Sequence, residues 1–451
     1  MIVVSGATLV LPDRILSPGT LVIDGGRIVE IRSDAPPSGY AESPFAFHGH
    51  YIVPGFIDVH LHGVEGIDSL DARPDGDAVA AIAERLPRRG VTAFCPTTVA
   101  CAPEALRRVL DQVRRARESP APRAARVLPA HLESNFINPE YAGAQPSVCL
   151  RSPRAALGSG RAGGSGRLGA SGGSGRDGSA RTFAEGYGAS TVARSASGGG
   201  SLSGERRDFT ASDILAEIER AAPDVGIVTL APELDGGLDL VRWLTARGHR
   251  VSLGHSAATY DEATAAIAAG ARHATHLFNR MPPLGHRAPG LAGAVLQSGE
   301  VAAEIICDGH HVHPALIRTA IAAKTPSRVF AITDATAAAG LPVGGRAQLG
   351  GQPITAGEST ALLADGTIAG SITTMDRVFQ TLVWRVGLSL TDAVTVCATT
   401  PARELGLVGH GLLAPDAVAD LVILDSRFTV VQTYIGGQLV YARNTPPSAT
   451  V

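Results

Sequence analysis

The sequence predicts an α/β fold: a closed (β/α)8 barrel of the TIM type with a small composite β-sandwich domain built from both chain ends. Three observations predict it. Apolar strand-like runs alternate with helical patterns through most of the 451 residues. Polar residues suited to metal binding follow the ends of several runs, and the two chain ends hold only short strand patterns separated by turns. Eight strand–helix repeats favour closure into a barrel, with an open doubly wound sheet as the structural alternative.

The expected barrel occupies residues 54–400. Its strands are apolar runs bounded by turn signals, expected at 54–60, 91–98, 126–133, 226–233, 250–256, 272–278, 302–308 and 328–335. Helical periodicity fills most of the intervals, at 76–89, 103–117, 211–222, 237–248, 259–269 and 314–324. Two further helical stretches, 371–387 and 390–406, are expected to pack outside the barrel.

Residues 1–53 and 401–451 are expected to form the β domain together. Each segment contains short β-like runs next to glycine turns, such as 27–31 and 438–441. Neither segment has enough strands for a stable sheet of its own, so we expect them to pair.

The stretch 157–204 breaks the barrel pattern. It consists mainly of Gly, Ser, Arg and Ala, with almost no large apolar residues. Such a segment buries too little surface to offset its ordering entropy, so we expect a disordered insertion in the third βα connection. A basic lid that attracts an anionic substrate is the alternative interpretation.

The composition argues against several functional classes. The formal net charge of −3 gives no electrostatic footprint for nucleic acid or for an anionic membrane. No apolar run approaches the roughly 20 residues that span a bilayer, and the first residues show no signal-peptide pattern. The five cysteines form no C-x-x-C pair, which argues against a disulfide framework. We therefore expect a cytoplasmic protein.

The stretch 54–63 carries the first chemical signal. His60 and His62 end an extended apolar run at i, i+2 spacing, so both rings lie on one face. The turn at Gly63 places them at the C-terminal end of the strand, where parallel barrels keep their active sites. Alone, such a pair is weak evidence, because two ordinary strand histidines explain it more often than a metal site does.

Other predicted strands end in groups of the same chemical type. They are Glu133, His255, His276, His311 beside Asp308, and Asp334. Each alone has an ordinary explanation as a capping or buried polar residue. Together, imidazole and carboxylate groups at one barrel mouth are what a divalent metal with open water positions requires. A carboxylate on the eighth strand can then move the proton of the nucleophile, so the pattern predicts a metal-dependent hydrolase.

The sequence resembles the amidohydrolase superfamily and, within it, the N-acetylglucosamine-6-phosphate deacetylases. The segments that carry the resemblance are 54–63, 131–139, 254–256, 275–284, 308–312 and 333–336. Its most specific parts are Glu133, where many superfamily members have a carboxylated lysine, and the Asn279-Arg280-Met281-Pro282 sequence after His276. Two departures are Ser134-Asn135, where the family more often has Gly-Pro, and Gln145, where some members place a basic residue near the phosphate.

The resemblance implies a role for each of these residues. The implied ligands are Glu133, His255 and His276 for one divalent metal, zinc or iron, and His60, His62 and Glu133 for a second. Asp334 is implied as general base and then general acid, and His311 as the group that polarises the acetyl carbonyl. The implied substrate-binding residues are Ala144, Gln145, Asn279, Arg280, Arg287, His311, Ile368, Ala369 and Gly370. Among them, Arg287 would take the phosphate, in the family often across a dimer interface.

The implied reaction is hydrolysis of the acetamide of N-acetyl-D-glucosamine 6-phosphate to glucosamine 6-phosphate and acetate. The expected partner is therefore a small amino sugar phosphate, and the expected assembly is a homodimer. A different amidohydrolase activity on the same metal site, on cyclic amides or N-acyl amino acids, is the main alternative. A non-catalytic descendant would be expected to lack ligands, and none of the expected ligands is missing from the sequence.

Overall fold

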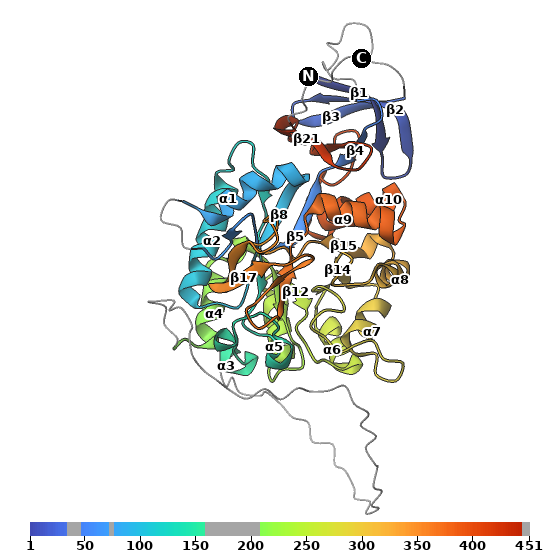
Figure 1. The fold of residues 1–451 in the computed structure, drawn as a ribbon. Coiled ribbons are helices and arrows are strands. Elements are labelled where there is room, and N and C mark those ends of the chain that lie inside the picture. The colour runs from blue at the N-terminus through green and yellow to red at the C-terminus, as the bar shows by residue number, and fades with distance from the viewer. Residues whose placement is uncertain (34–46, 72–75, 158–207, 444–451) are drawn as a thin grey trace, which may run out of the picture.

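The computed structural model describes residues 1–33, 47–71, 76–157 and 208–443. The glycine- and serine-rich insertion expected at 157–204 lies outside the described residues, apart from Leu157 at the end of a helix. Figure 1 shows a sheet domain that carries the N-terminus, joined to a larger body of strands and helices.

Eight parallel strands form the barrel, each hydrogen-bonded to its neighbours in chain order. They are β5 (Phe56–Leu61), β8 (Val91–Thr98), β10 (Ala130–Glu133), β11 (Val225–Leu230), β12 (Arg250–Leu253), β13 (His273–Ala274), β14 (Ala302–Ile306) and β15 (Val329–Ile332). A short strand, β9 (Arg126–Val127), pairs beside β8. A parallel bridge between Leu61 and Ala335 joins the last strand region to the first. The predicted barrel is confirmed, and the open sheet is excluded.

Helices follow the strands and cover the barrel. They are α1 (Ala78–Arg85), α2 (Pro103–Glu118), α3 (Pro153–Leu157), α4 (Ala211–Arg220), α5 (Gly237–Ala246), α6 (Tyr260–Ala268), α7 (Gly290–Gln297) and α8 (Pro314–Lys324). Sequence signals explain several of their starts. Thr210 and Thr259 each form a capping box with the acidic residue three positions later, which satisfies backbone N–H groups at the starts of α4 and α6.

Strands from both chain ends form one continuous seven-stranded sheet, so the composite β domain is confirmed. Its order is β22 (Gln438–Ala442), β21 (Val430–Ile435), β20 (Leu421–Leu424), β4 (Tyr51–Pro54), β1 (Ile2–Val10), β2 (Ile15–Asp24) and β3 (Arg27–Arg32). The two segments meet where β4 pairs antiparallel with β20. Only Gly55 separates β4 from the first barrel strand, so the sheet is anchored directly beneath the expected His60–His62 pair.

A four-stranded antiparallel sheet between β15 and α9 is not anticipated by the sequence analysis. It consists of β16 (Arg346–Leu349), β17 (Gln352–Ala356), β18 (Thr360–Leu362) and β19 (Ile368–Ser371). Its buried residues pack with Val99 and Ala338, which follow barrel strands β8 and β15. In Figure 1, β17 lies in front of the barrel strands. The sheet thereby delivers residues 368–371 to the barrel mouth.

The two outer helical stretches are confirmed, with interruptions. The first runs through α9 (Met375–Thr381) into a π-helical turn at Leu382–Val386. It begins four residues later than expected because Ser371 ends β19. The second comprises α10 (Leu390–Val394), a π-helical turn at Thr395–Thr399 and α11 (Thr400–Glu404). A small hairpin, β6 (Gly63–Val64) with β7 (Ile67–Asp68), follows the first barrel strand.

Gly55 provides a test of the junction between the sheet domain and the barrel. A Cβ atom at this position would lie 2.2 Å from both Cγ2 and Oγ1 of buried Thr92. Gly55→Ala is therefore expected to lower the free energy of unfolding by about 1–3 kcal/mol, measured by urea denaturation. Gly299→Ala is the matched control, since a Cβ there meets nothing within 4 Å. Equal stability of the two variants would contradict the predicted clash.

Candidate metal centre

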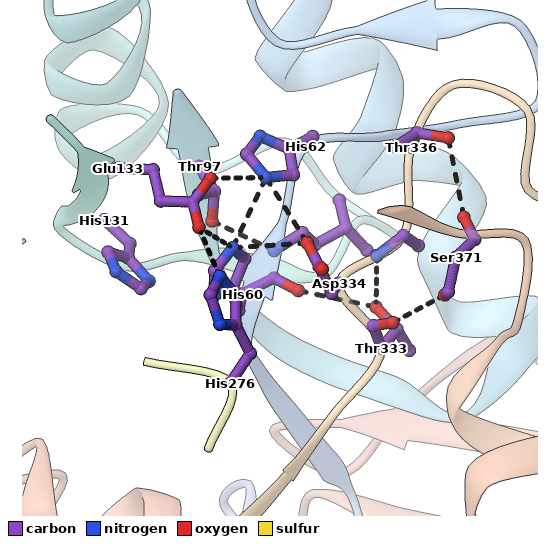
Figure 2. Close-up of polar contacts among 12 residues, drawn as sticks. His60, His62, Thr97, His131, Glu133, His276, Thr333, Asp334, Thr336 and Ser371 are labelled. Carbon is purple, nitrogen blue, oxygen red and sulfur yellow. Dashed lines mark hydrogen bonds and ion pairs between the residues drawn. The ribbon is translucent and has the colours of Figure 1, made fainter. Parts of the chain in front are cut away.

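The C-terminal ends of five barrel strands place imidazole and carboxylate groups around one point. His60 lies in β5 and Glu133 in β10, whereas His62, His255, His276 and Asp334 follow β5, β12, β13 and β15. His60, His62, Glu133 and Asp334 converge in Figure 2, with His276 beside them. The structure thus brings together all five predicted metal ligands and the predicted general base.

Glu133, His255 and His276 form the first ligand set. Glu133 Oε1 lies 2.8 Å from His255 Nε2 and 2.9 Å from His276 Nε2, and the two nitrogens are 3.0 Å apart. Donor atoms around a tetrahedral zinc ion are about 3.4 Å apart, given bonds of roughly 2.0–2.1 Å. These three atoms need to separate by only a few tenths of an ångström to fit such an ion.

His60, His62 and Glu133 form the second set. The Nε2 atoms of the two histidines are 3.3 Å apart, and they lie 3.6 and 3.5 Å from the oxygens of Glu133. Asp334 Oδ1 completes a four-atom group, at 3.3 Å from His60 Nε2 and 3.4 Å from His62 Nε2. These separations match the spacing of about 3.4 Å expected around a tetrahedral ion. Glu133 belongs to both sets.

Hydrogen bonds fix two of the four imidazoles so that Nε2 faces the centre. His255 Nδ1 lies 2.8 Å from the carbonyl oxygen of Tyr141, and His60 Nδ1 lies 3.0 Å from Glu304 Oε2. An acceptor at Nδ1 holds the ring proton there and leaves the Nε2 lone pair available to a metal. In the described part of the chain, Nδ1 of His62 and of His276 has no such partner.

The charges at the centre perturb one another strongly. Burial lowers the pKa of His60 to about 4, despite the nearby carboxylates. Burial also opposes a charge on His62, but hydrogen bonds to Asp334 and Glu133 raise its pKa to about 10. Burial likewise opposes ionisation of Asp334, yet its two histidine neighbours lower its pKa to about 2. These shifts favour the ionised form of Asp334 and the protonated form of His62.

Backbone strain accompanies the site. His255, His276 and Asp334 have φ values of 47°, 30° and 49°, in the left-handed region that such residues seldom adopt. Strain of this kind gathers at functional sites because it aims side chains that regular strands would direct elsewhere. Residue 370 approaches Asp334 so closely that it must be glycine. A Cβ on Gly370 would lie 2.9 Å from the Asp334 carbonyl oxygen.

Several predicted substrate-binding residues form a connected group at the rim of the mouth. The guanidinium of Arg280 packs over Gly143, next to Ala144, and donates to the carbonyl oxygen of Ile368 at 3.3 Å. Ile368 is exposed, whereas Ala369 is buried beneath it. Arg280 therefore ties the loop before Gln145 to the start of β19.

Gln145 is placed differently from the expectation of a sugar contact. Its side chain is buried, donates a short hydrogen bond from Nε2 to Glu133 Oε2, and accepts from the backbone N–H of Ala100 at 2.8 Å. Gln145 thus orients the carboxylate of Glu133, which both ligand sets share.

The remaining predicted residues occupy different environments. His311 Nδ1 lies 2.6 Å from Asp308 Oδ2, and its Nε2 has no partner in the described residues. Asn279 Nδ2 is likewise buried without a described partner. Both atoms are therefore available to a ligand. Arg287 is exposed on the loop between β13 and α7 and makes no ion pair within the described chain.

A cavity of about 550 Å³ lies beside the centre rather than over it. Asp308 and His310 line one side, and Asp376, Arg377 and other residues of the α9 region line the other. None of the metal-ligand candidates lines this cavity, so we do not place the chemistry there.

Sequence reasoning missed the polar residues beneath the ligands. Asp58 and Glu304 are fully buried inside the barrel, and burial raises the pKa of each to about 7. Asp58 accepts a 2.6 Å hydrogen bond from Thr333, next to Asp334, and Glu304 contacts His60. An acidic residue within an otherwise apolar strand is the signal that could have identified both.

Residues 245–440 match the model of the amidohydrolase family. Over 97% of its length, the chain is 34% identical to N-acetylglucosamine-6-phosphate deacetylase of Rattus norvegicus and covers 94% of that protein. The chain belongs to this deacetylase family. The predicted enzyme class, a metal-dependent amidohydrolase, is confirmed, and deacetylation is favoured over the cyclic-amide and N-acyl-amino-acid alternatives.

Two further relatives of the family bear on the substrate. The structure of the Mycobacterium smegmatis deacetylase, an aspartate-to-alanine variant in complex with N-acetyl-D-glucosamine-6-phosphate, superposes with a TM-score of 0.78 at 30% identity and covers 97% of this chain and 99% of its own. N-acetylgalactosamine-6-phosphate deacetylase of Escherichia coli O157:H7 is 30% identical, with 86% of this chain and 87% of that protein covered. No helix in the described ranges is long and apolar enough to cross a membrane.

The first ligand set predicts a specific loss of metal. His255→Asn is expected to weaken metal binding by roughly 100-fold or more, because even residues that only orient a ligand contribute 10–100-fold. His249→Asn is the matched control, since His249 is also buried but bonds the carbonyl oxygen of Val225, at the opposite end of the barrel strands. Competition with a chelator, followed by metal analysis, measures the effect. If both variants retain metal equally, the ligand assignment is wrong.

Proposed function

We propose that this protein hydrolyses the acetamide of N-acetyl-D-glucosamine 6-phosphate, releasing acetate and glucosamine 6-phosphate. One observation carries the proposal: the Asp334 carboxyl group lies 3.3–3.4 Å from two imidazoles of a five-ligand centre, at the same barrel mouth as the sugar-binding candidates. The near-full-length likeness to deacetylases of this substrate supports it.

The donor set supports zinc or iron as the resident metal. Imidazole nitrogens and carboxylate oxygens are ligands that both ions accept. Glu133, His255 and His276 would hold one ion, and His60, His62 and Glu133 a second. When bound, such an ion polarises the acetyl carbonyl and lowers the pKa of water from 15.7 to near 7.

Asp334 is the proposed proton carrier. As a carboxylate it accepts a proton from the attacking water while the new C–O bond forms. It then donates this proton to the amine nitrogen as the C–N bond breaks. His311 is the proposed donor to the acetyl oxygen: Asp308 fixes its ring, and its Nε2 has no described partner.

The rim residues are the proposed sugar site. Asn279 Nδ2 offers an unpaired donor, and Arg280 joins the loop of Ala144 to Ile368. Gly370 lies close to Asp334, and the N–H of the next residue, Ser371, donates to the Asp334 carbonyl oxygen at 2.9 Å, so the segment 368–370 can align the sugar with the proton carrier. We propose that Gln145 contributes to this site indirectly, by donating a hydrogen bond that orients Glu133.

Arg287 is the proposed phosphate ligand, contributed to the site of a second subunit. A guanidinium suits a phosphate dianion because it is permanently charged and bidentate. Its exposure and its lack of an ion pair in the described chain support contact with another molecule, and hence a homodimer. A cytoplasmic location is also proposed, because buried Cys95, Cys307 and Cys397 are free thiols, as expected in a reducing compartment.

The C4 epimer, N-acetyl-D-galactosamine 6-phosphate, is a second candidate substrate because one relative at 30% identity is named for it. The two substrates share the acetamide and the phosphate. They differ only in the direction of one hydroxyl, so turnover must distinguish them.

Acetate release by the purified protein tests the reaction. We expect chelator-sensitive release from N-acetyl-D-glucosamine 6-phosphate, restored by added zinc or iron and slower with the C4 epimer. Asp334→Asn should lower kcat by about 10²–10⁴-fold, since it removes the proton carrier. The unphosphorylated sugar is the control for phosphate recognition. Absence of release with any metal would rule out the proposal, and faster release from the epimer would reassign the substrate.

Mixing two inactive variants tests the role of Arg287. Arg287→Gln should mainly raise KM for the phosphosugar, and Asp334→Asn should abolish the chemistry. If Arg287 acts across the dimer, a hybrid contains one site with both functional residues. Reassociation of equal amounts should then restore about a quarter of wild-type sites, the statistical share for a two-fold dimer. No recovery, with hybrid formation verified by mass spectrometry, would place Arg287 in its own subunit's site or outside it.

A further inference from the structure

Glu304 is a buried acidic residue that the proposed reaction does not use. It lies in the middle of β14, between apolar neighbours, and is fully buried beneath the metal centre. Its Oε2 is 3.0 Å from His60 Nδ1, and its Oε1 has no hydrogen-bond partner among the described residues. An unpaired buried carboxylate oxygen costs free energy, so the contact with His60 calls for a functional explanation.

The opposite nitrogen of His60 faces the metal centre. His60 Nε2 lies 3.3 Å from both His62 Nε2 and Asp334 Oδ1. A neutral imidazole carries one proton, and a carboxylate acceptor at Nδ1 holds it there. The Nε2 lone pair then points to the place where His60, His62 and Glu133 would hold an ion.

This support differs from that of the other imidazole ligands. A neutral backbone carbonyl orients His255, and Nδ1 of His62 and of His276 has no described partner. Of these four imidazoles, His60 is the one whose Nδ1 faces a carboxylate in the described residues. A carboxylate behind a histidine raises the basicity of the ring as well as fixing its orientation.

His131 does not offer Glu304 a competing role. It approaches Glu304 Oε1 to 3.8 Å, and the triad His60, His131 and Glu304 is compact enough to consider as a metal site. However, His131 Nδ1 lies 3.1 Å from the Val59 carbonyl oxygen and its Nε2 lies 2.8 Å from Thr229 Oγ1. Both nitrogens already have hydrogen-bond partners, which fixes the His131 ring. The His60 ring packs against it with the two ring centroids 4.5 Å apart.

We propose that Glu304 is the positioning residue of the second metal position: by holding the Nδ1 proton of His60, it aims the Nε2 lone pair and sets how tightly His60, His62 and Glu133 bind a divalent ion. The inference rests on the proposed metal centre but not on the identity of the substrate.

Calorimetric titration of the metal-free full-length protein with Co²⁺ tests it without any turnover. The wild type is expected to bind two ions per chain, and His60→Asn one. Glu304→Gln should weaken only the ion that His60→Asn removes, by about 10–100-fold, because its amide can donate to Nδ1 and place the ring proton on Nε2. The visible absorption of bound Co²⁺ reports the same loss independently.

Two further variants separate positioning from a general effect of a buried charge. Glu304→Gln added to His60→Asn should cause no further change in Co²⁺ affinity, because the residue through which Glu304 acts is gone. Asp420→Asn removes a buried carboxylate that contacts an imidazole outside the centre, His410 Nδ1 at 3.0 Å, and should leave Co²⁺ affinity unchanged. Glu304→Asp provides a second substitution should the amide variant fail to fold.

Three outcomes would overturn the proposal. They are binding of a single ion by the wild type, equal Co²⁺ affinity of wild type and the Glu304 variants, and the same loss in the presence and absence of His60. Failure of the proposed function would be distinct, because a chain that binds Co²⁺ as predicted but releases no acetate would leave the role of Glu304 intact.

Discussion

The closure of the barrel between its first and last strands is the constraint on which the centre depends. The Ala335 carbonyl oxygen accepts from the N–H groups of His62 and Gly63 at 2.8 and 3.0 Å, and Asp334 N–H donates to the His60 carbonyl oxygen at 3.0 Å. These bonds hold residues that are distant in sequence at one edge. Asp334 and the histidine pair therefore have a fixed separation before any ligand arrives, which is the preorganisation that catalysis requires.

Residues near the solvent and residues inside the barrel also hold the side chains of the centre in place. Gln145 and the rim residues hold Glu133 and the β19 segment from the solvent side, whereas Glu304 and Asp58 hold His60 and Thr333 from the barrel interior. Few of the ligands rely on a flexible loop for their orientation. The four-stranded sheet between β15 and α9 extends this bracing, because its last strand pairs with the chain at Thr336.

The sequence predicted the parts of the structure that follow from hydrophobic patterning and from polar residues at the ends of apolar runs. Parallel strands buried on both faces appear as apolar runs, so the eight barrel strands and the ligands at their ends were predictable. The sheet at 346–371 was not, since strands such as Gln352–Ala356 are half-exposed and carry proline and polar residues. Glu304 and Asp58 lie inside strands rather than at their ends, so a search of strand ends passes over them. Arg287 lies on an exposed loop, where a single chain gives no indication of its contact.

The pairing of β4 with β20 has a consequence for how the chain is made. The registered partners Val53 and Val422 lie 369 positions apart in the sequence (422 − 53). During synthesis, all barrel strands leave the ribosome before β20 does. Until β20 is made, the edge of β4 that pairs with it has unpaired backbone N–H and C=O groups. An open edge can pair with other chains. The last strands therefore act as the closing step of biosynthesis, and a nascent chain stalled before them would be the form most prone to aggregate.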